Sequence, residues 1–363
     1  MLNGKTVAVV VPAYNEETQI GRVIDTMPGF VDRVIVVNDC SSDTTATIVK
    51  QHMGRLPKVA LPEKETPPDS IFSEADRIIA ELNKKERQML VPGDIITGDK
   101  NEKVVLINLQ QNSGVGAAIA KGYKWAKDHH IDCTAVMAGD GQMDPAELES
   151  ICRPVVDEDI DYVKGNRLIH RSANMIIPKT RFLGNSILSI FTKLASGYWH
   201  VSDTQSGFTA ISGKALNAIE LHKIFKSYGM PNDMLVKLNI AMCTIKEVEI
   251  KPVYNVGEKS KMKIYKVIPR VSWLLIKSFF KRLWTKYFFR DFHPLFYLYN
   301  MAFILFFVSI PFAIRILQYL VGESAGERPI LNSIMFMFLV VSASQSLLFA
   351  MWMDIQDNDR LYK

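Results

Sequence analysis

The sequence has few cysteines, and nothing in their arrangement suggests a bound metal or a disulfide framework. Only four occur among 363 residues, and Cys40, Cys133, Cys152 and Cys243 show no paired spacing. We therefore expect reduced thiols in a cytosolic domain, with neither a zinc site nor disulfides. A signal peptide is also not expected, because the apolar run near the N-terminus stops early, at Pro12.

Charged residues are absent from two long stretches near the C-terminus, Pro294–Ile314 and Ile330–Met353. Each exceeds the roughly 20 apolar residues that a helix needs to cross a bilayer. The sequence therefore predicts an integral membrane protein with a C-terminal two-helix transmembrane hairpin, whose turn covers Arg315–Pro329. Polar side chains within the second span would favour helix contacts, so a homo-oligomer is expected. These side chains are Ser342, Ser344, Gln345 and Ser346.

Acidic residues are absent from Lys259–Arg290, which holds ten Lys or Arg and carries much of the net charge of +5. A basic stretch can bind nucleic acid, but one that leads into a membrane span is better explained by anionic membrane lipids. We expect amphipathic interfacial helices over Lys261–Phe289, split in two at Pro269. Positive-inside reasoning places this stretch, the N-terminal domain and the C-terminal tail in the cytoplasm.

Apart from these stretches, buried-strand patterns alternate with polar turns and helical patterns. This rhythm predicts an α/β fold with a doubly wound, mostly parallel sheet. The expected strands are Lys5–Val11, Arg33–Val37, Val104–Leu109, Cys133–Ala138, Tyr162–Gly165, Thr209–Ile211 and Val248–Val253. The segment Leu56–Lys103 breaks the rhythm with several prolines and one helical pattern from Ser70 to about Leu90. Such an insert could be a lid, a partner surface or a mobile segment.

One turn stands out because it combines a carboxylate with a side-chain amide at the end of a buried strand. In VMAGDGQMDP (136–145), Asp140 and Gln142 follow the strand, and Asp144 with Pro145 opens the next helix. Ligands of open α/β sheets bind at the carboxyl ends of the strands, and oxygen ligands suit a hard cation. The alternative is an ordinary strand-to-helix turn.

Two further segments allow two interpretations each. The small residues of Gly114–Ala118 let a helix start approach either a phosphate or a neighbouring segment closely. Arg181 falls in the first turn of a helix expected over Lys179–Ser196, where a cation opposes the helix dipole, so it has either a binding role or a solvated surface position. Asn232 and Asp233 are expected to cap a helix that runs to Met242.

Five segments occur in a characteristic order, each at a strand end: VVVPAYNEE (9–17), VVNDCSSD (36–43), NSGVGAAI (112–119), AGDGQMDP (138–145) and DTQSGFTAI (203–211). Together they resemble family 2 glycosyltransferases with the GT-A fold. With the basic stretch and the hairpin, the chain resembles polyprenyl-phosphate sugar transferases of the dolichyl-phosphate-mannose synthase type. The resemblance runs from about Thr6 to the C-terminus, apart from the insert 56–103.

The resemblance implies a set of site residues. The nucleoside of a nucleotide-sugar donor would be held by Pro12, Ala13, Tyr14, Glu16 and Asp39. Asp140, with Gln142, would hold Mg²⁺ or Mn²⁺ against the donor diphosphate. The acceptor phosphate would be bound by Arg167, Arg181, Asn185, Lys259 and Lys261, and Asp140, Arg167 and Arg181 would carry the catalysis. The family's metal motif is usually Asp-x-Asp. Here Ala138 takes the place of the first Asp, and Asp140 is the second.

We therefore expect a metal-dependent enzyme that transfers one sugar, with inversion, from a UDP- or GDP-sugar to undecaprenyl or dolichyl phosphate at the cytoplasmic membrane face. The expected domains are a catalytic domain (1–258), interfacial helices (259–291) and a hairpin with a short tail (292–363). One alternative is transfer to a hydroxyl acceptor, such as a lipid-linked saccharide, with Asp233 as base. Another is a membrane-tethered binding protein that lost its chemistry with Ala138.

Overall fold

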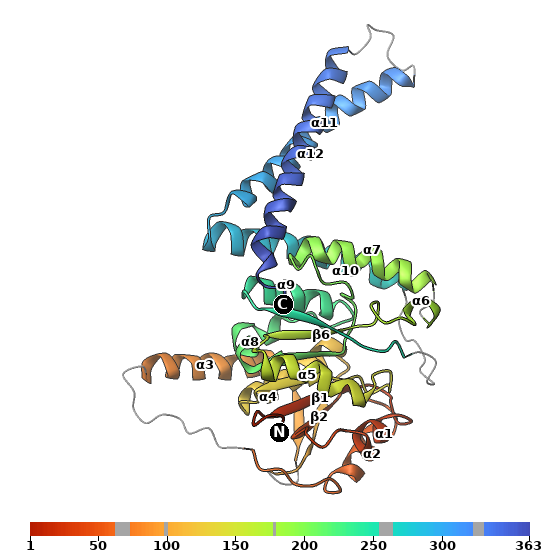
Figure 1. Cartoon of the computed structure of the whole chain (residues 1–363), viewed down its shortest axis with the longest axis vertical. Coiled ribbons are helices and arrows are strands. Elements are labelled where there is room, and N and C mark those ends of the chain that lie inside the picture. The colour runs from red at the N-terminus through yellow and green to blue at the C-terminus, as the bar shows by residue number, and fades with distance from the viewer. Residues whose placement is uncertain (62–72, 98–100, 177–178, 254–263, 322–329) are drawn as a thin grey trace.

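The computed structural model describes the chain except residues 62–72, 98–100, 177–178, 254–263 and 322–329. An α/β domain forms one end of the molecule, and a helical hairpin projects from the other (Figure 1). A layer of helices that includes α7 (Lys179–Ser196) and α10 (Ile264–Arg282) lies between them. The hairpin is therefore joined to the sheet through helices.

The described residues contain one sheet of eight strands in the order β3-β4-β2-β1-β5-β7-β6-β8. Its pairs are parallel except β3 with β4 and the two pairs made by β7. The doubly wound, mostly parallel fold expected from the sequence is thus confirmed. The strands are β1 (Val7–Ala13), β2 (Arg33–Asn38), β3 (Gly93–Ile96), β4 (Val104–Leu109), β5 (Cys133–Val136), β6 (Tyr162–Asn166), β7 (Thr209–Ser212) and β8 (Ile245–Glu249).

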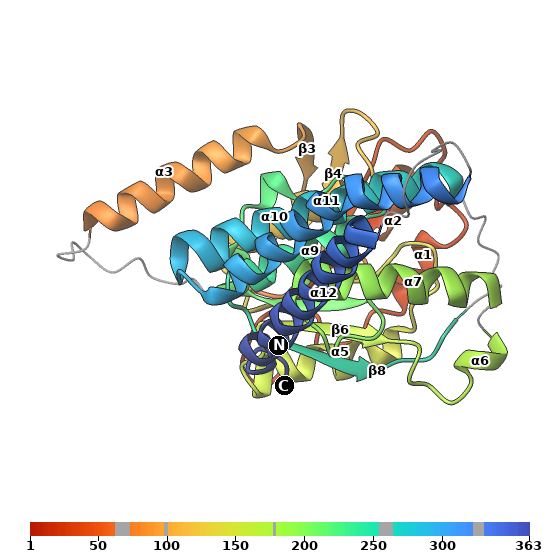
Figure 2. The ribbon, with the colours of Figure 1, turned by 90° about the horizontal axis from the view of Figure 1, so that it is seen from above.

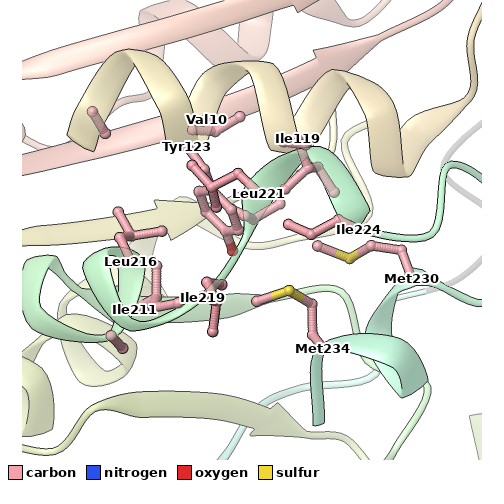
Figure 3. Close-up of a cluster of buried hydrophobic side chains, with 14 of the residues drawn as sticks. Val10, Ile119, Tyr123, Ile211, Leu216, Ile219, Leu221, Ile224, Met230 and Met234 are labelled. Atoms are coloured by element: carbon pink, nitrogen blue, oxygen red, sulfur yellow. The ribbon is translucent and has the colours of Figure 1, made fainter. Parts of the chain in front are cut away.

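Helices cover both faces of this sheet, which is why its central strands are apolar throughout. Alternate residues of β1 enter different cores: Val10 packs on one side, and Val9 and Val11 on the other. Figure 3 shows Val10 beside α4 (Val115–Asp128), together with Ile119, Tyr123 and other residues of the first core. The helix lies so close that a Cβ at Gly122 would be 2.4 Å from a methyl carbon of Val10.

The remaining α-helices of the described chain connect the strands or lie toward the hairpin. They are α1 (Ile20–Asp25), α2 (Thr45–His52), α3 (Ser73–Met89), α5 (Leu148–Asp157), α6 (Ala173–Ile176), α8 (Gly213–Ala218), α9 (Met230–Ile240), α11 (Pro294–Leu320) and α12 (Ile330–Asp359). Short 3₁₀ turns occur at Pro145–Glu147 and Leu221–Lys223, and a π-helical segment, η3 (Leu283–Arg290), follows α10.

The helices α11 and α12 pack on each other and are long and apolar enough to cross a membrane. Only 11% and 22% of their most apolar windows are buried inside the protein, which is unlike the core helices of a soluble domain. A third core joins their lower ends to α7, α9, α10 and η3. Its buried members are Ala195, Val236, Val271, Leu275, Phe279, Leu283, Tyr287, Leu295, Phe296, Tyr299 and Ala350.

Several local predictions were wrong. The last strand is Ile245–Glu249 rather than Val248–Val253. Helix α10 continues through Pro269 despite the backbone hydrogen bond that a proline cannot make, because Val271 and Leu275 anchor the helix in the third core; the irregular segment comes later, at η3. Arg315, expected in the hairpin turn, lies inside α11. Asn232 and Asp233 lie within the first turns of α9, which begins at Met230.

Candidate active site

The first two loops at the carboxyl ends of the strands are tied to each other by hydrogen bonds. The Asn15 amide donates to Ser41 Oγ at 2.9 Å, and the Ser42 amide donates to Asn15 Oδ1 at 2.9 Å. Asn15 has a left-handed backbone, with φ of 53°, which asparagine tolerates better than most residues. The loop that holds the proposed donor residues Tyr14 and Glu16 is therefore fixed against the loop after β2.

Asp39 joins a third loop to these two. Its carboxylate accepts hydrogen bonds from the amides of Ser113 (2.7 Å) and Gly114 (2.8 Å), directly before α4. The loop that contains Lys226 also lies close to the start of α4. The backbone amide of Gly116 donates to the Lys226 carbonyl at 3.0 Å. Of the two interpretations of the small residues at 114–118, the structure shows close packing. Asp39 is only 4% exposed, and its hydrogen bonds hold together the loops at which the nucleoside site is expected.

Asp140 lies after β5, on the same rim, in a tight turn. Its Oδ1 accepts a hydrogen bond from the backbone N–H of Gln142 at 3.0 Å. Gly141, between the two residues, has φ of +74°, in the left-handed region. The turn lies against the first loop, since the Gly139 amide donates to the Pro12 carbonyl at 3.3 Å. Asp144 caps the following turn by accepting the Ala146 amide at 2.9 Å, as predicted. The turn interpretation and the ligand interpretation are thus compatible.

The donor set at this turn suits a hard cation that takes most of its ligands from elsewhere. Asp140 and Gln142 offer carboxylate and amide oxygens, and both side chains are partly exposed. Among the described residues, no group of three or more His, Cys, Asp or Glu could hold a metal ion. A cation here would depend on substrate oxygens and water, which fits Mg²⁺ and is consistent with Ala138 in place of a second carboxylate.

Arg167 follows β6 and forms a bidentate ion pair with Asp203. Its Nε and Nη2 lie 2.8 and 3.0 Å from the two carboxylate oxygens, and its backbone amide is 3.2 Å from Asp203 Oδ2. Burial opposes ionisation of Asp203, but Arg167 and Lys164 outweigh it and lower the pKa of the carboxyl group. This pairing holds the guanidinium plane of Arg167 in a fixed orientation on the rim.

Sequence reasoning did not identify Lys164, a lysine in the middle of β6 that is completely buried. Its Nζ donates to the carbonyls of Thr204 (3.3 Å) and Ser206 (2.6 Å), and it lies opposite Glu247 in the strand register. Burial lowers the pKa of Lys164 to about 8, although Asp203 and Glu247 counteract this. Glu247 accepts the amides of Ser202 and Asp203, so both charges hold the same loop.

The loop 202–206 also contacts α7, the helix on which Arg181 was predicted. Ser189 Oγ lies 3.0 Å from Thr204 Oγ1. Thr192 Oγ1 donates to Asn232 Oδ1 at 3.2 Å, and Gln205 Nε2 donates to the same oxygen at 2.8 Å. These polar contacts are largely buried and connect α7, the loop and α9. They fix how far α7 is rotated about its axis.

The structure places the other predicted acceptor residues less completely. Arg181 and Asn185 belong to α7, one helical turn apart, and positions 181, 185 and 189 lie on one face of it. Asn185 is partly exposed, whereas the Arg181 side chain lies outside the described residues, as do Lys259 and Lys261. Of the predicted acceptor residues on α7 and at 259–261, only those on α7 belong to an element that contacts the loop 202–206, whose Asp203 binds Arg167.

Asp233, the predicted base of the alternative reaction, is buried and engaged. Its Oδ2 accepts the Phe225 amide at 2.8 Å and forms a short ion pair with Lys237, four residues on in α9. The Asp233 side chain is therefore enclosed by α9 and the loop before it, with its Oδ2 already engaged by two partners. This geometry is typical of a structural ion pair.

Comparison with known proteins identifies the domain. The family model "Glycosyl transferase family 2" matches residues 8–66 and 93–219, more than half of the chain. The chain belongs to this glycosyltransferase family. The match begins in β1 and ends just after α8, so it includes Asp39, Asp140, Arg167 and Asp203 and leaves out the whole of α3.

Two curated glycosyltransferases are similar over most of their length. A UDP-N-acetylglucosamine–dolichyl-phosphate N-acetylglucosaminyltransferase of Methanococcus voltae is 29% identical over 252 residues, which are 69% of this chain and 87% of the relative. A dolichyl-phosphate beta-glucosyltransferase of Trichomonas vaginalis is 22% identical, over 77% of this chain and 75% of its own. Among solved structures, glucosyl-3-phosphoglycerate synthase of Mycobacterium tuberculosis with UDP matches 77% of this chain and 80% of its own, with a TM-score of 0.47 and 18% identity.

Proposed function

We propose that this glycosyltransferase moves one sugar, with inversion, from a UDP- or GDP-sugar to a polyprenyl phosphate at the cytoplasmic face of a membrane. The proposal agrees with the dolichyl-phosphate acceptors in the names of the two curated relatives. The donor would lie along the rim formed by Pro12–Glu16, Asp39 and Asp140. The acceptor phosphate would lie at Arg167 and the start of α7. A bound Mg²⁺ or Mn²⁺ would offset the charge of the donor diphosphate.

The observation that carries the proposal is the third core, which the catalytic domain shares with the hairpin. Ala195 of α7 and Val236 of α9 pack in one cluster with Leu295 of α11 and Ala350 of α12. The helix that carries the predicted phosphate residues is thereby fixed next to the apolar helices. Placing both substrates at set positions in this way is a large part of what an enzyme of this class must do.

The outer surfaces of α7 and α10 support a membrane beside this layer. Each helix exposes large apolar side chains, which a soluble protein rarely gathers on one side. They include Ile187, Ile190 and Phe191 of α7 and Trp273, Ile276 and Phe280 of α10. An acceptor whose tail stays in the bilayer would present its phosphate at this depth.

The state of Asp233 favours a phosphate acceptor over a hydroxyl acceptor. A phosphate is already anionic at neutral pH and needs no base, whereas a hydroxyl group must lose its proton as it attacks. The carboxylate proposed for that task is paired with Lys237 instead. Inversion follows if the phosphate oxygen displaces the nucleoside diphosphate in a single step.

The residues after α12 support a hairpin with both ends on one side of the membrane. The Ile245 amide donates to the Leu361 carbonyl at 2.7 Å, and the Lys363 amide donates to the Ile245 carbonyl at 3.0 Å. These residues thus lie at the edge of the catalytic sheet, beyond β8. The cytoplasmic side is inferred from the basic stretch 259–290.

The test is to incubate membranes that contain the full chain with a panel of UDP- and GDP-sugars and with undecaprenyl or dolichyl phosphate. Mass spectrometry of the lipid extract should reveal one polyprenyl-phosphate sugar, formed from one donor. Membranes with Asp140→Asn in place of the wild type provide the matched control. A glycosylated diacylglycerol or saccharide as the only product would refute the phosphate acceptor, and no product with any donor would support the inactive alternative.

A further inference from the structure

The insert contains a helix that lies outside the family match and projects away from the rest of the protein. Residues 67–92 fall in the gap of the family match, and α3 occupies 73–89. Figures 1 and 2 both show α3 extending sideways beyond the α/β domain. Its position therefore needs an explanation that the transfer reaction does not provide.

The base of α3 is firmly attached to the domain. Glu86 lies 3.0 Å from Lys127 Nζ and accepts the Leu221 amide at 2.7 Å. Arg87 forms an ion pair with Asp128 at 2.8 Å, and Leu90 enters the first core just after the helix. These contacts hold the helix in its outward direction.

The projecting half presents an unusual apolar face. Ile78, Ile79 and Leu82 are 50%, 55% and 58% exposed, and their spacing of i, i+1 and i+4 places them on one side of the helix. This is the same side as Glu86, which contacts the domain further along. Large aliphatic side chains gathered on one helix face normally mark a surface that is covered by a partner.

Charge around this face is arranged so that the helix complements itself. Glu74 and Lys85 are both exposed and stand eleven residues apart, about three turns, so they lie on the same flank of the apolar face. If a second α3 packs against the first in the antiparallel direction, a two-fold axis near Ile79 places Ile78 beside Leu82 of the second copy. The same axis places Glu74 beside the second copy's Lys85, twice over.

A membrane permits this antiparallel arrangement. Figure 1 shows α3 running across the direction of the hairpin. A two-fold axis parallel to the hairpin reverses the direction of α3 and leaves both hairpins pointing the same way, as insertion in one bilayer requires. Confinement to the bilayer also raises the effective concentration of the two copies, so a short helix pair is sufficient.

We propose that α3 is a self-association helix through which two copies of this chain form a two-fold dimer, with the face Ile78, Ile79 and Leu82 at its centre. A lipid surface is a weaker candidate for this face. Helix α3 lies at the level of the sheet rather than of α7 and α10 (Figure 1).

The first test measures the mass of the detergent-solubilised full chain by size-exclusion chromatography with light scattering, corrected for detergent. The wild type should have twice the 41.1 kDa of one chain. The double variant Ile78→Glu/Leu82→Glu should elute with half the wild-type mass. Ala80→Glu, on the opposite face of α3, adds the same type of charge and should stay dimeric. Transfer activity in all three would show that the domain is folded.

Charge exchange tests the antiparallel direction. Glu74→Lys and Lys85→Glu should each raise the dimer dissociation constant several-fold, because each places like charges side by side. The combined variant Glu74→Lys/Lys85→Glu should restore it, since the two charges exchange places. A monomeric wild type, a dimer that survives Ile78→Glu/Leu82→Glu, or a combined variant no better than the single ones would each overturn the proposal.

Discussion

Arg282 and Asp354 form a bidentate ion pair in which neither side chain is more than 1% exposed. The Nη1 to Oδ1 distance is 2.7 Å and the Nη2 to Oδ2 distance is 2.8 Å. Arg282 also donates to the carbonyls of Leu194 and Ala195 in α7. One guanidinium group therefore links the end of α10, the lower end of α12 and the helix expected to carry the acceptor site.

Asp354→Asn should lower the free energy of unfolding by about 3–5 kcal/mol, because it leaves the Arg282 charge buried without its counter-charge. Thermal unfolding in detergent would measure the change. Arg360→Ala provides a comparison, since the Arg360–Asp357 pair spans 3.4 Å with an exposed arginine, and its loss should cost less than about 1 kcal/mol. Similar unfolding temperatures for the two variants would contradict a linking role for Arg282.

Asp140→Asn should abolish transfer, whereas Gln142→Ala should reduce it less. An asparagine keeps an oxygen that can accept the hydrogen bond from the backbone N–H of Gln142, so the turn should persist. The negative charge that a hard cation needs is lost. Initial rates over a Mg²⁺ titration would measure both variants. Near-normal turnover of Asp140→Asn at ordinary Mg²⁺ would show that the metal assignment is wrong.

Arg181→Ala should sharply reduce turnover and raise the KM for polyprenyl phosphate, with nucleotide binding nearly unchanged. A guanidinium group binds phosphate oxygens bidentately, so Arg181→Lys should recover only part of the activity. Steady-state kinetics with varied acceptor, together with calorimetry of nucleotide binding, would separate the two effects. If nucleotide affinity fell and the acceptor KM stayed the same, Arg181 would belong to the donor site.

Lys164 should give protein stability a distinctive pH dependence. Its pKa is about 8 in the folded chain and about 10.5 when exposed, so between these values the unfolded chain binds more protons. Stability from this group therefore rises as the pH increases from about 8 to 10.5, and it is independent of pH below that window. Urea unfolding of wild type and Lys164→Met at several pH values would measure the difference, and equal slopes would contradict the buried charge.

Some of this structure could be predicted from local pattern. The strands β1 and β2 are buried on both faces, so their apolar runs are unmistakable, and α7 begins and ends where expected. By contrast, β3 consists of four half-exposed residues in a proline-rich insert, without a hydrophobic period to reveal it. Pro269 misled the prediction because the packing of Val271 and Leu275 in the third core, which the local sequence does not show, keeps the helix continuous.

The candidate site was predictable only in part, for a related reason. The strand-end motifs and the family resemblance predicted Asp39, Asp140 and Arg167, and the three residues follow strands whose carboxyl ends lie on one rim. Asp203, the partner of Arg167, is 36 residues away along the chain. Lys164 has no distinguishing local sequence, and it is buried because β6 pairs with β7 and β8. Pairings of this kind depend on the tertiary fold rather than on local sequence.

The bond between Ile245 and the segment after α12 has a consequence for how the protein is made. The ribosome finishes β8 long before it reaches Leu361, and both apolar helices are synthesised in between. The edge of the catalytic sheet is therefore completed only after both apolar helices have been synthesised. Until then the nascent chain exposes an open edge at β8, which can pair with a strand of another chain.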